Sequence, residues 1–241
     1  MRVIRVQGQA DFAGGAADWI TAHLRDKPDA TLALPTGNTP LGLYAELILR
    51  SKAGTADLSS ATLFNLDEYC GLPASDAHSY AAFLRRHLIA PLELTADKVR
   101  LLRGDAPDSR AECRAYDAVI ERCGGIDLCV LGLGTNGHIA FNEPGAAWDQ
   151  RTHQVELSEA TRATHARQAK RPWAIPASGL TMGIQTILEA RHILLLIAGS
   201  NKEAARNALH RGAADRLWPV TSLLAHRSVT AIELCGPAVC P

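Results

Sequence analysis

The stretch Ile126–Gly145, IDLCVLGLGTNGHIAFNEPG, decides how the rest of the chain is interpreted. Its first residues are mostly apolar and run into Gly132, which predicts a buried strand that enters a glycine-rich turn. That turn delivers His138, with Asn136 two residues before it and Glu143 five residues after it. Strand-end loops of α/β proteins hold functional side chains because the sheet fixes the backbone beneath them. The stretch therefore predicts a proton-transfer site built on an imidazole, an amide and a carboxylate.

The composition is that of an ordinary globular protein with a sizeable core. The 241 residues are 47% hydrophobic and 21% charged, and the formal net charge is zero. No global field therefore draws the chain to nucleic acid or to a membrane surface. The longest apolar run, Ile193–Ala198, has the length of a strand and not of a membrane span. The start, Met1-Arg2-Val3, opens directly into a strand-like pattern without a signal peptide, so we expect a cytoplasmic protein.

Six cysteines are present, and none forms a C-x-x-C pair. No neighbouring histidine completes a zinc pattern, so the sequence favours free thiols in a reducing compartment and no metal site. The cysteines are Cys70, Cys113, Cys123, Cys129, Cys235 and Cys240.

Strand-like and helix-like segments alternate along the whole chain. Strand patterns fall at residues 3–6, 31–34, 62–64, 126–130, 154–157, 192–198 and 228–234, and helical patterns at residues 11–24, 41–48, 79–90, 109–122 and 179–190. Strands that alternate with crossover helices predict a mostly parallel sheet covered on both faces, with the pocket at the carboxyl ends of the strands. We therefore expect one three-layer, doubly wound α/β domain spanning residues 1–241. A basic segment around residues 158–178, interrupted by prolines, is expected to be mobile.

The turn after the second predicted strand is typical of an anion site. Thr36, Gly37, Asn38 and Thr39 lie between that strand and the start of a helix. Free backbone N–H groups and the positive end of the helix dipole converge at such a turn. The spacing is not that of a Walker loop, and a simple turn between strand and helix explains the same residues equally well.

Further polar groups follow other predicted strands. Asp67 and Glu68 are adjacent, and only one can face the pocket if the strand continues, because neighbouring side chains point to opposite faces. Lys202 stands at a helix start and Arg167 in the basic segment, and each could instead be an ordinary surface charge. Taken together, these groups indicate acid–base chemistry on a small phosphorylated metabolite.

The central loop is also compatible with other roles. His138 could be a core histidine, although its place in a glycine-rich strand-end loop favours a functional role. His138 and Glu143 could bind a metal, but no third ligand has an obvious place. No Ser or Cys lies in a G-x-S-x-G nucleophile turn.

Five motifs carry a resemblance to a known family. They are LPTGNTPLGLY (Leu34–Tyr44), FNLDEYCGL (Phe64–Leu72), LGLGTNGHIAFNEPG (Leu131–Gly145), IPASGLTMGIQTIL (Ile175–Leu188) and AGSNKEAA (Ala198–Ala205). With them the chain resembles the glucosamine-6-phosphate deaminases (isomerases), which are related to the 6-phosphogluconolactonases. The H-I-A-F-N-E-P-G segment is similar to the deaminases and differs from the lactonases. The resemblance implies the same α/β sheet, of the Rossmann-like sugar-phosphate isomerase type.

The resemblance also implies roles for the residues of the site. Thr36, Gly37, Asn38, Thr39, Arg167 and Lys202 would bind the substrate phosphate. His138 would open the sugar ring, oriented by Glu143 and Asn136, and Asp67 would accept the C2 proton. The implied reaction converts glucosamine 6-phosphate to fructose 6-phosphate and ammonia without a metal or another cofactor.

Two positions depart from other family members. Asn136 stands where some members carry an aspartate, so we expect Asn136 to orient His138 and Glu143 to supply the charge. Ala146-Ala147 and His153/Val155 stand where allosterically activated members carry serines and a basic pair. With a chain that ends at Pro241, this predicts no activation by N-acetylglucosamine 6-phosphate, and a monomer or small homo-oligomer.

Three alternatives remain open from the sequence. The chain could be a 6-phosphogluconolactonase or a galactosamine-6-phosphate deaminase, or a regulator that senses a sugar phosphate in the same pocket. Intact Asp67, His138 and Glu143 argue against the regulator, because a sensor does not need a base for C2.

Overall fold

A seven-stranded parallel sheet forms the centre of the molecule in the computed structural model, which describes residues 1–168 and 173–235. The strand order is β1-β10-β9-β6-β2-β3-β5, and every neighbouring pair is parallel. The strands are β1 (Arg2–Val6), β2 (Thr31–Leu34), β3 (Thr62–Asn65), β5 (Val99–Arg100), β6 (Leu128–Gly132), β9 (His192–Ile197) and β10 (Val229–Leu234). This confirms the predicted mostly parallel α/β sheet.

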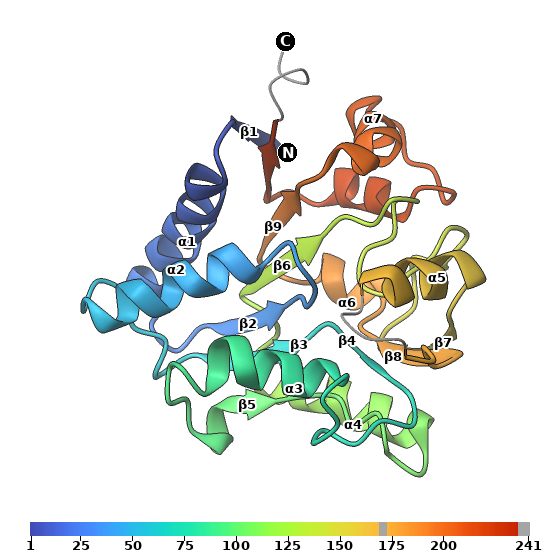
Figure 1. Ribbon diagram of the computed structural model, residues 1–241, viewed down its shortest axis with the longest axis horizontal. Helices are drawn as coiled ribbons and strands as arrows, with labels where there is room; N and C mark the ends of the chain where they lie inside the picture. Colours follow the sequence, from blue (N-terminus) through green and yellow to red (C-terminus); the bar gives the residue numbers. More distant parts are fainter. Residues whose placement is uncertain (169–172, 236–241) are drawn as a thin grey trace.

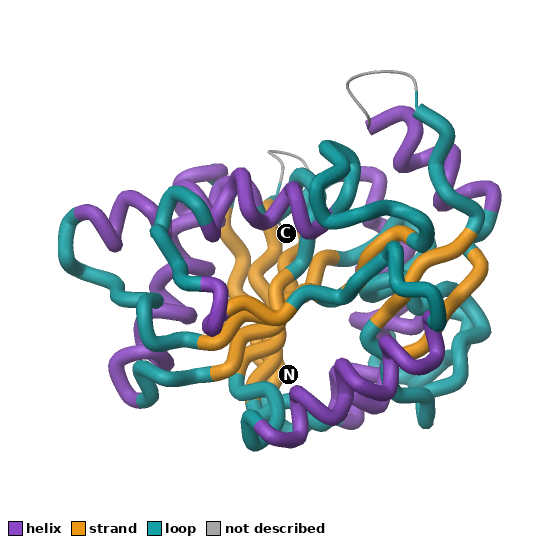
Figure 2. The backbone as a smooth tube through the Cα atoms, turned by 90° about the horizontal axis from the view of Figure 1, so that it is seen from below, coloured by secondary structure: helices purple, strands orange, loops and turns teal. Residues whose placement is uncertain are grey.

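Helices cover both faces of this sheet (Figures 1 and 2). The α-helices are α1 (Gln9–Asp26), α2 (Leu41–Lys52), α3 (Tyr80–Leu84), α4 (Ser109–Arg122), α5 (Glu159–Gln168), α6 (Ile184–Leu188) and α7 (Glu203–His210). A π-helical turn (Arg85–Ile89) continues α3, and 3-10 turns occupy Ala96–Lys98, Ser200–Lys202 and Pro219–Ala225. The sequence prediction of a helix over residues 109–122 coincides with α4.

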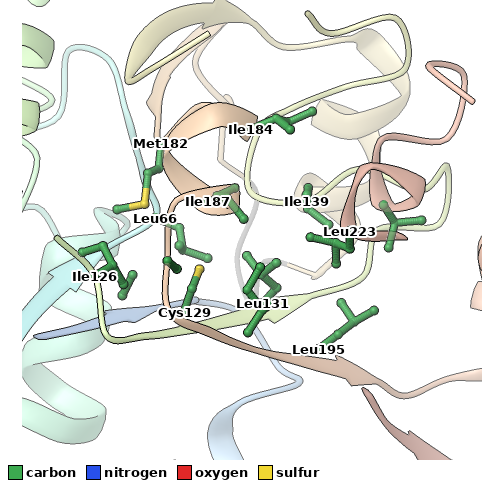
Figure 3. Close-up of a cluster of buried hydrophobic side chains, with 14 of the residues drawn as sticks. Leu66, Ile126, Cys129, Leu131, Ile139, Met182, Ile184, Ile187, Leu195 and Leu223 are labelled. Carbon is green, nitrogen blue, oxygen red and sulfur yellow. The ribbon is translucent and has the colours of Figure 1, made fainter. Parts of the chain in front are cut away.

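The alternation of side chains along the strands divides the core in two. In β6, Leu128 and Val130 join the cluster under α1 and α2, whereas Cys129 and Leu131 join the cluster under α4, α6 and α7. Figure 3 shows part of the second cluster, in which the labelled apolar side chains of β6, β9 and α6 point toward one another. A strand that buries both faces is continuously apolar, and this accounts for the sequence of β6.

A second, three-stranded sheet was not predicted. β4 (Asp67–Tyr69) and β7 (His153–Glu156) both pair antiparallel with β8 (Ser178–Thr181) at one side of the main sheet (Figure 1). The predicted helix over residues 179–190 is therefore wrong in its first part, because β8 precedes a short α6. Gly179 lets β8 lie close to its neighbours, since a Cβ there would lie 2.7 Å from the Phe141 ring and 3.0 Å from the Glu68 carbonyl oxygen.

The remaining sequence predictions are met unevenly. Cys70, Cys113, Cys123 and Cys129 are free thiols as expected. The expectation is wrong for Cys235, which is disulfide-bonded, and Cys240 lies outside the described residues. Of the segment around residues 158–178, α5 and the start of β8 are described, and residues 169–172 lie outside the described residues. No helix within the described ranges is long and apolar enough to cross a membrane.

Candidate active site

The carboxyl ends of the parallel strands open into a cavity of about 490 Å³. Loops after β2, β3, β6 and β9 contribute to its walls, as expected for an open α/β sheet. It collects most of the residues singled out from the sequence: Thr36, Gly37, Asn38, Thr39, Asp67, Asn136, His138 and Lys202. Glu143 and Arg167 are the two predicted site residues that do not line it.

A chain of hydrogen bonds fixes the imidazole of His138. Its Nδ1 lies 2.8 Å from Asn136 Oδ1, and Asn136 Nδ2 donates to Glu143 Oε2 at 2.8 Å. Because the amide nitrogen is engaged by the carboxylate, its oxygen faces the histidine, and Nδ1 must carry the ring proton. His138 Nε2 is then the unprotonated nitrogen of the ring. The structure thus places Asn136 between His138 and Glu143.

His138 is also kept neutral by its surroundings. Desolvation in the cavity, followed by the positive charge of Lys202, lowers its pKa to about 4. An imidazole with a free Nε2 and no charge at neutral pH can accept a proton from a substrate hydroxyl.

Two glycines let this loop come close to its neighbours. A Cβ on Gly134 would lie 2.4 Å from atoms of the His138 ring, so the imidazole rests directly against bare backbone. Gly137 has a φ of +83°, and a Cβ there would lie 2.8 Å from the Trp218 ring. Gly134 is therefore required by packing against the histidine ring, and Gly137 by its backbone conformation and its contact with Trp218, whereas a Cβ on Gly132 would meet nothing within 4 Å.

Asp67 and Glu68 point in opposite directions, as predicted from strand alternation. Asp67 faces the cavity, and its Oδ1 is buried without a hydrogen-bond partner in the described part of the chain. Burial, and then the charge of Glu68, raises the pKa of Asp67 well above its ordinary value. Glu68 instead accepts backbone N–H bonds from Tyr69, Tyr80 and Ala81 at 2.8–2.9 Å. Asp67 is thus available for chemistry, whereas Glu68 anchors the start of α3.

The unpredicted strand β8 ties the two halves of the site together. Thr181 pairs with Asp67 across the small sheet, and its Oγ1 accepts the backbone N–H of Phe141 at 3.1 Å. The Asn142 amide donates to the carbonyl of Met182 at 2.9 Å. The backbone of Asp67 and the loop that carries His138 are therefore both held by Thr181 and Met182, at the end of β8.

The predicted phosphate-binding groups line the cavity, with the exception of Arg167. Lys202 ends the 3-10 turn before α7, and its partial burial lowers its pKa. The turn at Gly37 has a φ of +90°, which favours glycine there. Arg167 is exposed on α5 and donates to Thr164 Oγ1 at 3.1 Å, while Thr164 itself lines the cavity.

Sequence reasoning missed the contribution of α5 and of several aromatic residues. Ala160, Thr161, Thr164 and His165 of this helix line the cavity, and their spacing places them on one helical face. His165 Nδ1 lies 2.6 Å from the Tyr69 hydroxyl, and burial followed by the charge of His138 lowers its pKa to about 4. The i, i+4 spacing of Thr161 and His165 is the one sequence signal that could have indicated this face.

The wall of the cavity includes a stacked aromatic pair. The rings of His78 and Trp173 stack with centroids 4.5 Å apart and an interplanar angle of 13°. Both residues line the cavity, as does Arg86 from the π-helical turn after α3. Pairs so distant in sequence cannot be recognised from local patterns.

No metal centre accompanies these groups in the described ranges. Within residues 1–168 and 173–235, no three His, Cys, Asp or Glu side chains gather closely enough to hold a metal ion. His138 and Glu143 do not meet directly as two ligands of such a centre would, because the amide of Asn136 lies between them and bonds to both.

The parallel sheet, with a strand-end cavity that holds a neutral imidazole and a buried carboxyl, defines an α/β protein with a site for acid–base chemistry. A family model for glucosamine-6-phosphate isomerases/6-phosphogluconolactonase matches residues 7–232, and the chain belongs to this family. It is 40% identical to a glucosamine-6-phosphate deaminase of Shouchella clausii, over 96% of this chain and 94% of that protein. It is 39% identical to glucosamine-6-phosphate deaminase 2 of Bacillus subtilis, again over 96% and 94% of the two chains.

Solved structures agree with this assignment. A monomeric glucosamine-6-phosphate deaminase superposes with a TM-score of 0.93 at 37% identity, and the match covers 97% of each chain. A 6-phosphogluconolactonase of Thermotoga maritima shares the fold, with a TM-score of 0.76 at 17% identity, over 97% of this chain and 98% of that one.

Proposed function

We propose that the protein is a glucosamine-6-phosphate deaminase, which converts glucosamine 6-phosphate and water to fructose 6-phosphate and ammonia. The observation that carries the proposal is that one cavity holds both the buried carboxyl of Asp67 and the neutral imidazole of His138. The relatives named glucosamine-6-phosphate deaminase over nearly the whole chain support the same reaction.

Ring opening is assigned to His138. Its free Nε2 accepts the proton of the anomeric hydroxyl, and the imidazolium so formed returns a proton to the ring oxygen as the C1–O bond breaks. The developing charge is stabilised through Asn136 by the Glu143 carboxylate, which lies one hydrogen bond further from the ring.

The open-chain sugar is then deprotonated at C2. Asp67 takes this proton, the C2–H electrons form the C1=C2 bond of an enolamine, and O1 takes up a proton as the C1=O π bond opens. A second proton is then added at C1 while the nitrogen lone pair forms the C=N bond, which yields a C2 imine. Water hydrolyses the imine to the ketone and releases ammonia. A carboxyl with a raised pKa is a strong base once ionised, and the ammonium group of an amino sugar favours that ionised form by its charge.

The substrate phosphate is assigned to Lys202 and the turn Thr36–Thr39, with Arg167 as a further ligand from α5. Lys202 and the turn line the cavity, and the Arg167 guanidinium contacts a residue that does so. A phosphate bound by these groups would hold the sugar in one orientation relative to His138 and Asp67.

The proposed function also carries expectations about the oligomeric state, the cellular location and the regulation of the protein. A monomer or small homo-oligomer is supported by the monomeric deaminase of similar structure. We expect cytoplasmic action, where phosphorylated sugars are retained, and hyperbolic kinetics that N-acetylglucosamine 6-phosphate leaves unchanged. Sigmoidal kinetics abolished by that compound would contradict the absence of allosteric control.

A single set of assays tests the proposed function. Ammonia release is measured from glucosamine 6-phosphate and galactosamine 6-phosphate, alongside hydrolysis of 6-phosphogluconolactone. We expect ammonia from the gluco epimer and no lactone hydrolysis above background. Faster turnover of the galacto epimer or of the lactone would assign the chain to that activity instead.

A further inference from the structure

The first turn of α5 sits on the carboxylate that supports His138. Thr161 Oγ1 donates a hydrogen bond to Glu143 Oε1, and Ser158 Oγ lies 3.5 Å from the same oxygen. The other oxygen, Oε2, accepts from Asn136. Both ends of this carboxylate are therefore engaged, one by the central loop and one by the helix.

The contact with Thr161 is built into the fold. Thr161 is only 4% exposed, and its backbone N–H donates to Ser158 Oγ at 3.1 Å, which satisfies one free group at the start of the helix. A carboxylate beside the first turn of a helix is also favoured by the positive end of the helix dipole.

The orientation of Glu143 controls which nitrogen of His138 is free. With Glu143 in place, the Asn136 amide turns its oxygen to Nδ1 and leaves Nε2 unprotonated. If the carboxylate rotated away, the amide could flip and donate its own N–H to Nδ1. The ring proton would then occupy Nε2, and the imidazole could not accept a proton from the sugar.

We infer that Thr161 is a positioning residue for ring opening. Its hydroxyl holds Glu143 against Asn136, so the basic tautomer of His138 is selected when α5 lies on the cavity. This inference rests on the proposed function, because it assigns Thr161 a role in the first step of that reaction. Phosphate capture by α5 and assembly of the ring-opening base are thereby coupled through one hydroxyl.

The test uses three variants of the full-length enzyme. Thr161→Val keeps the shape and removes the hydroxyl, Thr161→Ser keeps the hydroxyl, and Thr21→Val is the matched control. Thr21 is also 4% exposed and lies on α1, and its Oγ1 has no partner among the described residues. Turnover of glucosamine 6-phosphate is compared with binding of its reduced, open-chain analogue, 2-amino-2-deoxyglucitol 6-phosphate, which needs no ring opening.

We expect Thr161→Val to lower kcat roughly 10- to 100-fold, the effect of losing a hydrogen bond to a charged group, and to bind the analogue with unchanged affinity. Thr161→Ser should restore most of the turnover, and Thr21→Val should match the unaltered enzyme. A Thr161→Val enzyme with full turnover would overturn the inference. So would equal losses of turnover and analogue affinity, or an equal loss in Thr21→Val. Absence of ammonia release from the unaltered enzyme would instead reject the proposed function.

Discussion

Replacing Asn136 with aspartate changes the charge next to His138 and should shift the pH dependence of the reaction. The His138 Nδ1 and Asn136 Oδ1 atoms are 2.8 Å apart, and the pKa of the imidazole is about 4. A carboxylate at this distance raises the pKa of a neighbouring base by roughly 1 to 3 units. His138 must be neutral to accept the sugar proton, so activity falls as the pH drops through its pKa. Asn136→Asp should therefore move the acid limb of the profile upward.

The size of this shift depends on Glu143. In Asn136→Asp a carboxylate oxygen replaces the amide nitrogen that now lies 2.8 Å from Glu143 Oε2. Two carboxylates so close share one proton, so the added charge is only partly expressed until the pH rises. We therefore expect the lower end of the range, an acid limb raised by about one pH unit.

The measurement is kcat/KM for ammonia release across the pH range in which the enzyme stays folded. Asn207→Asp adds the same charge on the exposed side of α7, outside the cavity, and should leave the profile in place. An acid limb that does not move in Asn136→Asp would refute the assignment of this limb to His138 and the orienting role of Asn136.

Three further changes test separate parts of the site. Gly134→Ala places a Cβ 2.4 Å from the His138 ring and should lower kcat by roughly 100-fold with little loss of stability. The control is Gly15→Ala on α1, which should retain activity because a Cβ there makes only an ordinary contact at 3.8 Å. Equal kcat values in the two variants would contradict the packing of the imidazole against Gly134. Lys202→Met should raise KM, and it should also move the acid limb of the pH profile upward because the Lys202 charge lowers the pKa of His138. A raised KM with an unmoved acid limb would contradict the effect of Lys202 on the pKa of His138. Glu68→Ala leaves two buried backbone N–H groups and one part-buried one without an acceptor and should lower the free energy of unfolding in urea by about 3 kcal/mol. Glu68→Gln should lower it by less, since it loses one of those bonds, and equal stability of both variants would contradict an anchoring role.

The loop that carries His138 could be predicted from the sequence because its signals are local. An apolar strand, closely spaced glycines and a polar triplet all lie within twenty residues of Ile126. The opposite directions of Asp67 and Glu68 were also predictable from strand geometry, whereas the choice of Asp67 as the residue in the pocket came from the family resemblance. Both features needed only one element and its period.

The rest of the site depends on tertiary contacts. β8 has four residues and is recognisable only through its pairing with β4 and β7, because its sequence alone predicts the start of a helix. Thr161 and His165 belong to the site because α5 lies over the cavity, which no local pattern specifies. The hydrogen-bond order, with Asn136 between His138 and Glu143, likewise follows from the folded loop.

The most direct test of the account is the turnover of Asp67→Asn. The carboxylate is expected to remove the C2 proton, and its Oδ1 is buried without a partner in the described part of the chain. Asparagine has nearly the same shape but cannot accept a proton there. We predict that kcat for ammonia release falls by roughly 10³- to 10⁴-fold while 2-amino-2-deoxyglucitol 6-phosphate still binds. Turnover within tenfold of the unaltered enzyme would contradict the assignment of Asp67 as the base.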